Sequence, residues 1–265
     1  MPALQDIEWD RAECVAAVRD FYNFLVKMYL RESDVIEPPA GGWPHINPVN
    51  LRSIRKAKRV IGLLRHLPYL RHAADSMNEV QGASDTFFAD WKTAMENTNT
   101  AYKFRRNTEG GLDVRSPYLV GLTSGREESS IFMLDTRLAV VYWVECDGAI
   151  RDEPTYETIE DDAYGYAHPD EAGWRADSGA WTVTDFFETL KDQFRELKFV
   201  PVSRHRVYDV YTHGMHEGML EMVQGIYREH GWPDLEQYRK TECLLAIRKA
   251  LHENYPGERS FELEE

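Results

Sequence analysis

The sequence has little cysteine and no apolar run long enough to cross a membrane. Three of its 265 residues are cysteine (Cys14, Cys146 and Cys243), and no two of them form a CxxC pair. Isolated cysteines in odd number are typical of free thiols in a reducing compartment. No apolar stretch reaches about 18 residues, so we expect no transmembrane helix. The first residues, MPALQDIEWDRAE, lack the basic and apolar regions of a secretory signal. We therefore expect a cytoplasmic location, with the nucleus left open.

Motifs that identify a reaction or a metal ion are lacking as well. The G-x-S-x-G turn, the HExxH motif and the spacing of a calcium loop do not occur. The glycine-rich turn at residues 41–45 lacks the Lys-Ser/Thr pair of a phosphate loop. Cys146 lies at a predicted strand end, where a nucleophile is often found, but no histidine is near it in sequence. We expect no cofactor and no metal, and enzymatic activity stays undecided.

Positive charge is scarce overall but is concentrated in one segment. Lysine and arginine number 31 against 45 aspartates and glutamates, a net charge of −14. An acidic chain is repelled by phosphates, so we expect neither nucleic acid nor a membrane as partner. The segment Arg52–Arg71 is nevertheless basic. It fits a phosphate or RNA clamp, a solvated helix face, or an intramolecular contact with the acidic residues 145–171.

Apolar residues make up 43% of the chain and aromatic residues 12%, enough for a substantial core. Helical spacing of apolar residues predicts helices over 10–30 and 51–66, and a short one over 85–96. The stretch between residues 117 and 148 is instead rich in β-branched and aromatic residues. It predicts three strands, Tyr118–Thr123, Ile131–Leu134 and Leu138–Glu145. The third strand is apolar on both faces, which predicts that both faces are covered.

The second half of the chain is predicted to be mostly helical. Residues 145–177 are acidic and rich in turn residues, and indicate a surface loop. A helix begins near Thr182, where Thr182 and Asp185 resemble a capping box. Further helices are predicted over 215–230 and from Pro233 to about 254. The order of elements predicts an α+β fold, a small and mainly antiparallel sheet packed with helices. We expect one domain over 1–265: helical over 1–100, a sheet core over 115–150, an acidic loop over 151–180 and helices over 181–256.

Two groups of side chains are candidates for a site. His213, His216 and Glu217 are spaced to share a helix face, as catalytic residues or metal ligands would be, although polar surface residues fit this pattern too. Aromatic residues in loops provide the second group: Trp43, His45 and Trp174 are candidates for binding a partner. Each tryptophan fits a place in the core equally well.

Several segments of the chain resemble a family of filamentous-fungal proteins, and this resemblance implies no activity. The segments are YNFLVKMYL, PPAGGWPHI, LLRHLPYLR, LDTRLAVVYWVECDG and GWPDLEQYRKTECL. The order of elements is more distantly similar to the SUKH superfamily, which includes a yeast cell-wall-assembly regulator and bacterial toxin-immunity proteins. The similar parts are an early helix, an aromatic turn, the strands YLVGLT, IFMLD and AVVYWVE, and the helix WTVTDFFETL. The acidic loop and two C-terminal helices depart from that pattern, and no functional residue is carried over.

The SUKH resemblance implies a domain that binds other proteins. We therefore expect a protein-interaction or regulatory module without catalytic activity, whose partner is another protein. The alternative is an enzyme that acts on a small molecule in an aromatic-lined pocket, with His213, His216 and Glu217. The sequence does not indicate the oligomeric state.

Overall fold

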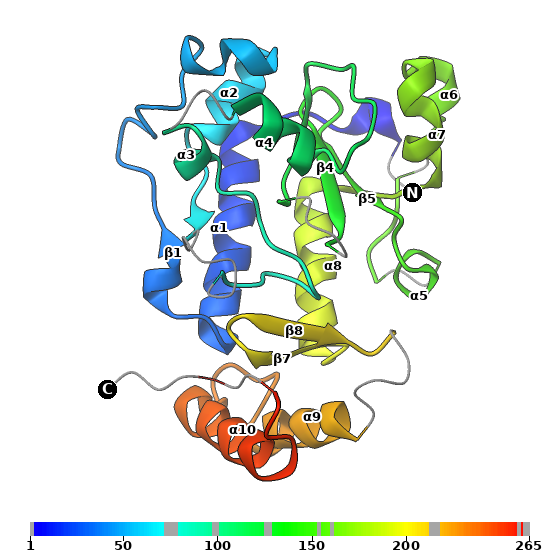
Figure 1. Cartoon of the computed structure of the whole chain (residues 1–265). Helices are drawn as coiled ribbons and strands as arrows, with labels where there is room; N and C mark the ends of the chain where they lie inside the picture. The colour runs from blue at the N-terminus through cyan, green and yellow to red at the C-terminus, as the bar shows by residue number, and fades with distance from the viewer. Residues whose placement is uncertain are drawn as a thin grey trace.

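The computed structural model describes residues 3–71, 79–96, 101–124, 129–152, 155–159, 162–211, 218–258 and 261. It confirms the predicted α+β class (Figure 1). The α-helices are α1 (Arg11–Met28), α2 (Lys58–Leu64), α3 (Trp91–Ala94), α4 (Ala101–Thr108), α5 (Gly148–Arg151), α6 (Ala163–Tyr166), α7 (Pro169–Asp177), α8 (Val183–Arg195), α9 (Met219–Glu229) and α10 (Lys240–Asn254). Short 3-10 helices are η1 (Leu4–Asp6), η2 (Glu32–Asp34) and η3 (Asn50–Ile54). The strands are β1 (Val35–Ile36), β2 (Tyr69–Leu70), β3 (Leu119–Gly121), β4 (Ile131–Asp135), β5 (Val140–Val144), β6 (Gly179–Thr182), β7 (Phe199–Ser203) and β8 (Arg206–Asp209).

The largest sheet in the described part of the chain is antiparallel, with the strand order β3-β4-β5-β6. Its register pairs Phe132 with Trp143 on one face, and Met133 with Tyr142 on the other. The first face joins the main hydrophobic core, and the second forms a smaller cluster. Every residue of β5 is buried, which confirms the prediction that this strand is covered on both faces. The fourth strand, β6, was not predicted.

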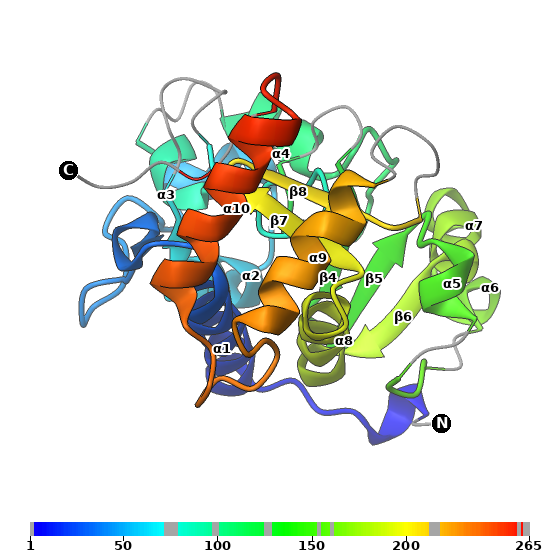
Figure 2. The same ribbon diagram turned by 90° about the horizontal axis from the view of Figure 1, so that it is seen from below.

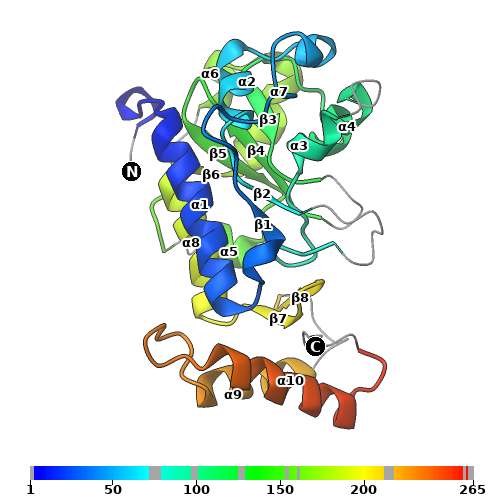
Figure 3. The same cartoon turned by 90° about the vertical axis from the view of Figure 1, so that its left-hand side faces the viewer.

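Two long helices, α1 and α8, pack side by side against the first face of this sheet (Figures 1 and 3). The helix α1 begins after Asp10, whose carboxylate accepts a hydrogen bond from the backbone N–H of Ala12 at 2.6 Å. The predicted cap at Thr182 is confirmed, because its hydroxyl accepts the N–H of Asp185 at 3.2 Å. Phe21 and Phe187 meet between the helices, with ring centroids 5.4 Å apart. The helices therefore form where amphipathic spacing predicted them.

The prediction of an acidic surface loop over 151–180 is wrong for the described residues, which contain α6, α7 and β6. Pro169 occupies the first turn of α7, where its missing N–H costs nothing. Glu171 and Arg175, four residues apart on α7, are 1% and 3% exposed and form an ion pair of 2.9 Å. The charged residues of this region predicted exposure to solvent. Glu171 and Arg175 are instead buried, because each neutralises the charge of the other.

The helix predicted over 51–66 is interrupted in the structure. The 3-10 helix η3 ends at Ile54 and is followed by Arg55, which has a left-handed φ of 52°, and α2 begins only at Lys58. The interruption allows the Ala57 N–H to donate to the Pro117 carbonyl at 2.8 Å and buries Lys56 beside Glu109. The helix predicted over 85–96 is likewise reduced to α3. In both places, contacts between distant segments override local helical spacing.

The region 181–256 is not wholly helical, because it includes the hairpin of β7 and β8. Pro201 lies within β7, although proline cannot donate a hydrogen bond to a strand ladder. Its carbonyl accepts a hydrogen bond from the Tyr227 hydroxyl at 3.0 Å, which joins the hairpin to α9. The helices α9 and α10 lie side by side across this hairpin (Figures 2 and 3). Pro233–Tyr238 forms turns, so α10 begins later than predicted.

No helix among the described residues combines the length and the apolar character needed to span a membrane.

Candidate functional site

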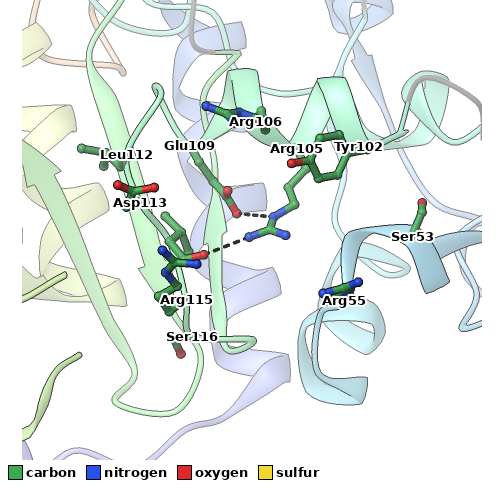
Figure 4. Close-up of a pocket in the computed structure, with 11 residues that line it drawn as sticks. Ser53, Arg55, Tyr102, Arg105, Arg106, Glu109, Leu112, Asp113, Arg115 and Ser116 are labelled. Atoms are coloured by element: carbon green, nitrogen blue, oxygen red, sulfur yellow. Dashed lines mark hydrogen bonds and ion pairs between the residues drawn. The ribbon is translucent and has the colours of Figure 1, made fainter. Parts of the chain in front are cut away.

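A pocket of about 530 Å³ opens between η3, α4 and the segment that leads into β3 (Figure 4). The wall from η3 lies more than 40 residues before the other two walls in the sequence, which are close neighbours along the chain. The residues that line the pocket are Ser53, Arg55, Tyr102, Arg105, Arg106, Glu109, Leu112, Asp113, Val114, Arg115 and Ser116. The lining is mainly polar, so the pocket suits a ligand that makes hydrogen bonds and ion pairs.

Positive charge dominates the lining of this pocket. Four arginines (Arg55, Arg105, Arg106 and Arg115) face two carboxylates, Glu109 and Asp113. Ionised, these side chains sum to a charge of 4 − 2 = +2. The whole chain carries −14, so the pocket opposes the charge of the molecule around it. A local concentration of arginine in an acidic protein favours an anionic ligand.

Arg105 joins all three walls of the pocket (Figure 4). Its Nε atom donates to Glu109 Oε1 at 2.8 Å. Its Nη1 atom donates to the Ile54 carbonyl at 3.2 Å, and its Nη2 atom donates to the Val114 carbonyl at 3.1 Å. A guanidinium has five N–H donors in a rigid plane, which is why one side chain can connect three segments. Arg105 therefore shapes the pocket before any ligand arrives.

Glu109 is shared between Arg105 and a buried lysine. Lys56 Nζ lies 2.6 Å from Glu109 Oε1, and the two side chains are 1% and 4% exposed. Burial lowers the pKa of Lys56 to about 8, although the Glu109 carboxylate opposes the shift. At neutral pH the ammonium is therefore largely protonated, and the trio of Lys56, Glu109 and Arg105 carries a net charge of +1.

The other arginines are more available to a ligand. Arg55, Arg106 and Arg115 are exposed. Arg115 pairs with Asp170 at 2.9 Å, but both side chains are open to solvent and such pairs are weak. Within the described part of the chain, no acidic side chain forms an ion pair with Arg55 or Arg106. These two guanidinium groups keep their donors for water or for an anion.

A second buried network holds the wall that carries Arg115. One carboxylate oxygen of Glu171 accepts the backbone N–H groups of Arg115 and Ser116, at 2.6 and 2.5 Å. Its other oxygen accepts Arg175 Nη2 at 2.9 Å, and the same Arg175 atom lies 2.9 Å from Asp135 Oδ2. Since Arg105 binds the Val114 carbonyl, residues 114–116 are held from two sides. This wall is a rigid part of the pocket.

The predicted site residues lie elsewhere. His213, His216 and Glu217 fall outside the described residues. Trp43 is 8% exposed and belongs to the main core, where its indole N–H donates to the Leu67 carbonyl at 2.8 Å. His45 is exposed two residues further on. Trp174 packs against the smaller cluster, with its ring centroid 5.7 Å from that of Tyr142.

The two tryptophans thus belong to different clusters on opposite faces of the sheet, and the structure does not bring them together. Neither lines the arginine pocket. Of the sequence signals, the basic segment alone pointed to the pocket, through Arg55. Arg105, Arg106 and Arg115 were missed because arginines in a polar stretch of sequence are typical of any solvated surface. Their proximity in sequence to the acidic residues Glu109 and Asp113 was the one feature of the sequence that could have indicated a charged site.

Cysteine and metal chemistry find little support in the described residues. Burial raises the pKa of Cys14, Cys146 and Cys243 to about 12 each, so their thiols stay protonated at neutral pH. No group of three or more His, Cys, Asp or Glu in this part of the chain is arranged to hold a metal ion. Cys146 is therefore a poor nucleophile in this fold.

A scan against protein-family models, a search of curated proteins and a search of solved structures all found no match to this chain. The resemblance to the SUKH superfamily stays a prediction.

Proposed function

We propose that this protein is a binding module that recognises an anionic ligand in the arginine pocket. The observation that carries the proposal is the convergence of four arginines on one pocket of a chain with a net charge of −14. The proposal keeps the expectation of binding without catalysis, but it replaces the predicted protein partner by an anionic ligand and the predicted binding residues Trp43, His45 and Trp174 by the pocket arginines.

Two features of the pocket support recognition by fixed groups. Arg105 is held by its ion pair with Glu109, and the 114–116 wall is held by hydrogen bonds from Arg105 and to Glu171, so little side-chain order has to be created on binding. Arg55 and Arg106 retain unused donors beside this rigid frame. Hydrogen bonds from arginine to an anion are stronger than those between neutral groups, and paired geometry adds specificity. The arrangement therefore favours a ligand with a compact charged group.

Removal of Arg55 tests this proposal. The full chain is titrated in a calorimeter with benzoate, phenyl sulfate and phenyl phosphate, three anions that share an aromatic ring. We expect at least one of them to bind, and Arg55→Ala to weaken that binding about tenfold or more, because a hydrogen bond to a charged group is lost. Arg52→Ala is the matched control, since Arg52 is exposed on η3 but does not line the pocket. Absence of binding to all three anions, or an equal loss in both variants, contradicts the proposal.

Binding is also expected to weaken as the pH rises from 7 to 9. Over this range Lys56, with its pKa lowered to about 8, loses its proton. Glu109 is then balanced by Arg105 alone, so the positive potential at the pocket falls and an anion is held less tightly. Phenyl phosphate is the suitable probe because its second pKa is about 6 and its own charge stays constant above pH 7.5.

Lys56→Arg provides the control for this pH dependence. An arginine remains protonated throughout this range, so the affinity of that variant is expected to change little between pH 7.5 and 9. Glu109, Arg105 and Glu171, the other charged groups that act on Lys56, are present in both proteins. A decline of equal size in both proteins would show that Lys56 is not its cause.

A further inference from the structure

We infer that the ligand of the arginine pocket is a small phosphomonoester, bound through its dianionic phosphate group. This inference rests on the proposed function and specifies its ligand class. Carboxylates and sulfate esters carry one negative charge per group, whereas a phosphate monoester carries close to two at neutral pH. The charge, the donors and the size of the pocket each bear on this choice.

The charge balance of the pocket matches a dianion. The lining side chains sum to +2. Two charged side chains form ion pairs with the side chains of this lining: Lys56 pairs with Glu109 and Asp170 pairs with Arg115, and their charges of +1 and −1 leave the sum at +2. Glu171 binds the backbone N–H groups of Arg115 and Ser116, and its negative charge is paired with Arg175, which does not line the pocket. A phosphate monoester neutralises this charge. A single carboxylate would leave one positive charge without a partner in a partly enclosed space, where such a charge costs more than in bulk water.

The donors of the pocket also fit a phosphate group. Arg55 and Arg115 lie on opposite sides of the pocket, with the guanidinium of Arg105 between them (Figure 4). Hydroxyl groups come from Ser53, Ser116 and Tyr102. Phosphate has three terminal oxygens that accept hydrogen bonds from several directions, and arginine binds it through paired N–H groups. Planar carboxylates use only two oxygens, so they engage fewer of these donors.

The pocket is larger than the phosphate group alone requires. Its volume of about 530 Å³ falls in the range of small-molecule sites, about 300–1,000 Å³. Tyr102 is 54% exposed at this pocket, and Leu112 adds apolar surface to the lining. An aromatic ring exposed to this extent offers a stacking or packing surface. The remainder of the ligand therefore has room and an apolar contact, which an inorganic phosphate ion would not use.

Comparison of phenyl phosphate with phenyl sulfate tests the inference. The two compounds share ring and tetrahedral head group but differ in charge at pH 7. Titration calorimetry of the full chain is expected to give about tenfold tighter binding for phenyl phosphate, from the added charge-assisted hydrogen bonds. Arg106→Ala should remove most of this difference. Lys103→Ala is the control, because Lys103 is an exposed cation of the same helix that does not line the pocket.

The results of these titrations test the phosphate assignment separately from the proposed anion-binding function. Equal affinity for phosphate and sulfate, with Arg55→Ala still weakening both, overturns the phosphate assignment and leaves an anion-binding pocket. Binding of neither compound overturns the phosphate assignment, and absence of binding to benzoate as well overturns both. Inorganic phosphate and a phosphotyrosine peptide complete the series. Inorganic phosphate that binds as well as phenyl phosphate, or a peptide that binds more than about tenfold tighter, overturns the assignment to a small organic phosphomonoester.

Discussion

Replacement of Arg175 by alanine is expected to lower the free energy of unfolding by about 3–5 kcal/mol. Its guanidinium lies between the carboxylates of Asp135 and Glu171, at 2.9 Å from each, and all three side chains are 2–3% exposed. Without Arg175 two buried carboxylates face each other with no cation. In the folded protein, pairing with Arg175 offsets the free-energy cost of removing these carboxylates from water. Without Arg175 that cost is no longer offset for either carboxylate. Urea unfolding followed by circular dichroism measures the change.

Two further variants show whether charge or packing causes this loss. Arg175→Met fills much of the same space without a charge, so it is expected to be nearly as destabilising as Arg175→Ala. Arg19→Ala removes an arginine from an ion pair with Glu37 that is 40–49% exposed, and a change of less than about 1 kcal/mol is expected. If Arg175→Met unfolds at the urea concentration of the unmodified protein, the network contributes through packing alone, and the prediction is wrong.

Replacement of Glu109 by alanine is expected to cost a similar amount, about 3–5 kcal/mol. Glu109 is the partner of both Lys56 and Arg105, at 2.6 and 2.8 Å. Its loss leaves the buried Lys56 ammonium beside a second cation and without an acceptor. The same urea titration measures the effect at pH 7, where Lys56 of the unmodified protein is largely protonated.

A double substitution identifies the source of the second effect. Lys56→Met combined with Glu109→Ala removes the buried cation together with its partner. The double variant should therefore be more stable than Glu109→Ala alone, because no uncompensated lysine remains. Glu96→Ala, in an ion pair with Lys92 whose Glu96 side chain is 48% exposed, serves as the control and should change stability by less than about 1 kcal/mol. A double variant less stable than Glu109→Ala would contradict this account.

These two networks also explain where prediction from the sequence failed. The α7 helix was interpreted as an acidic loop because Glu171 and its neighbours are charged. The burial of Glu171 depends on Arg175 and Asp135, the latter 36 residues before Glu171 in the sequence. Similarly, the helix predicted through Lys56 is interrupted where that lysine meets Glu109, 53 residues away. Sequence periodicity contains no information about such pairings.

The sequence alone determined the elements whose signals are local. The α1 helix follows from amphipathic spacing and from the cap at Asp10, and α8 from the cap at Thr182. The β4–β5 hairpin follows from two apolar strands and the turn between them, and together these elements settled the α+β class. Each of these features depends on residues within a few positions of one another, where propensity and hydrogen-bonding geometry act directly.

Only the tertiary structure identified the candidate functional site, the arginine pocket. Arg55, Arg105 and Arg115 line one pocket because η3, α4 and the segment before β3 fold together, and because Arg105 and Glu171 bind the backbone of the same wall. Trp43, a candidate for binding a partner, is instead 8% exposed in the core. Burial and long-range ion pairing depend on the whole fold, so they assign roles to arginine and tryptophan that residue type and spacing leave open.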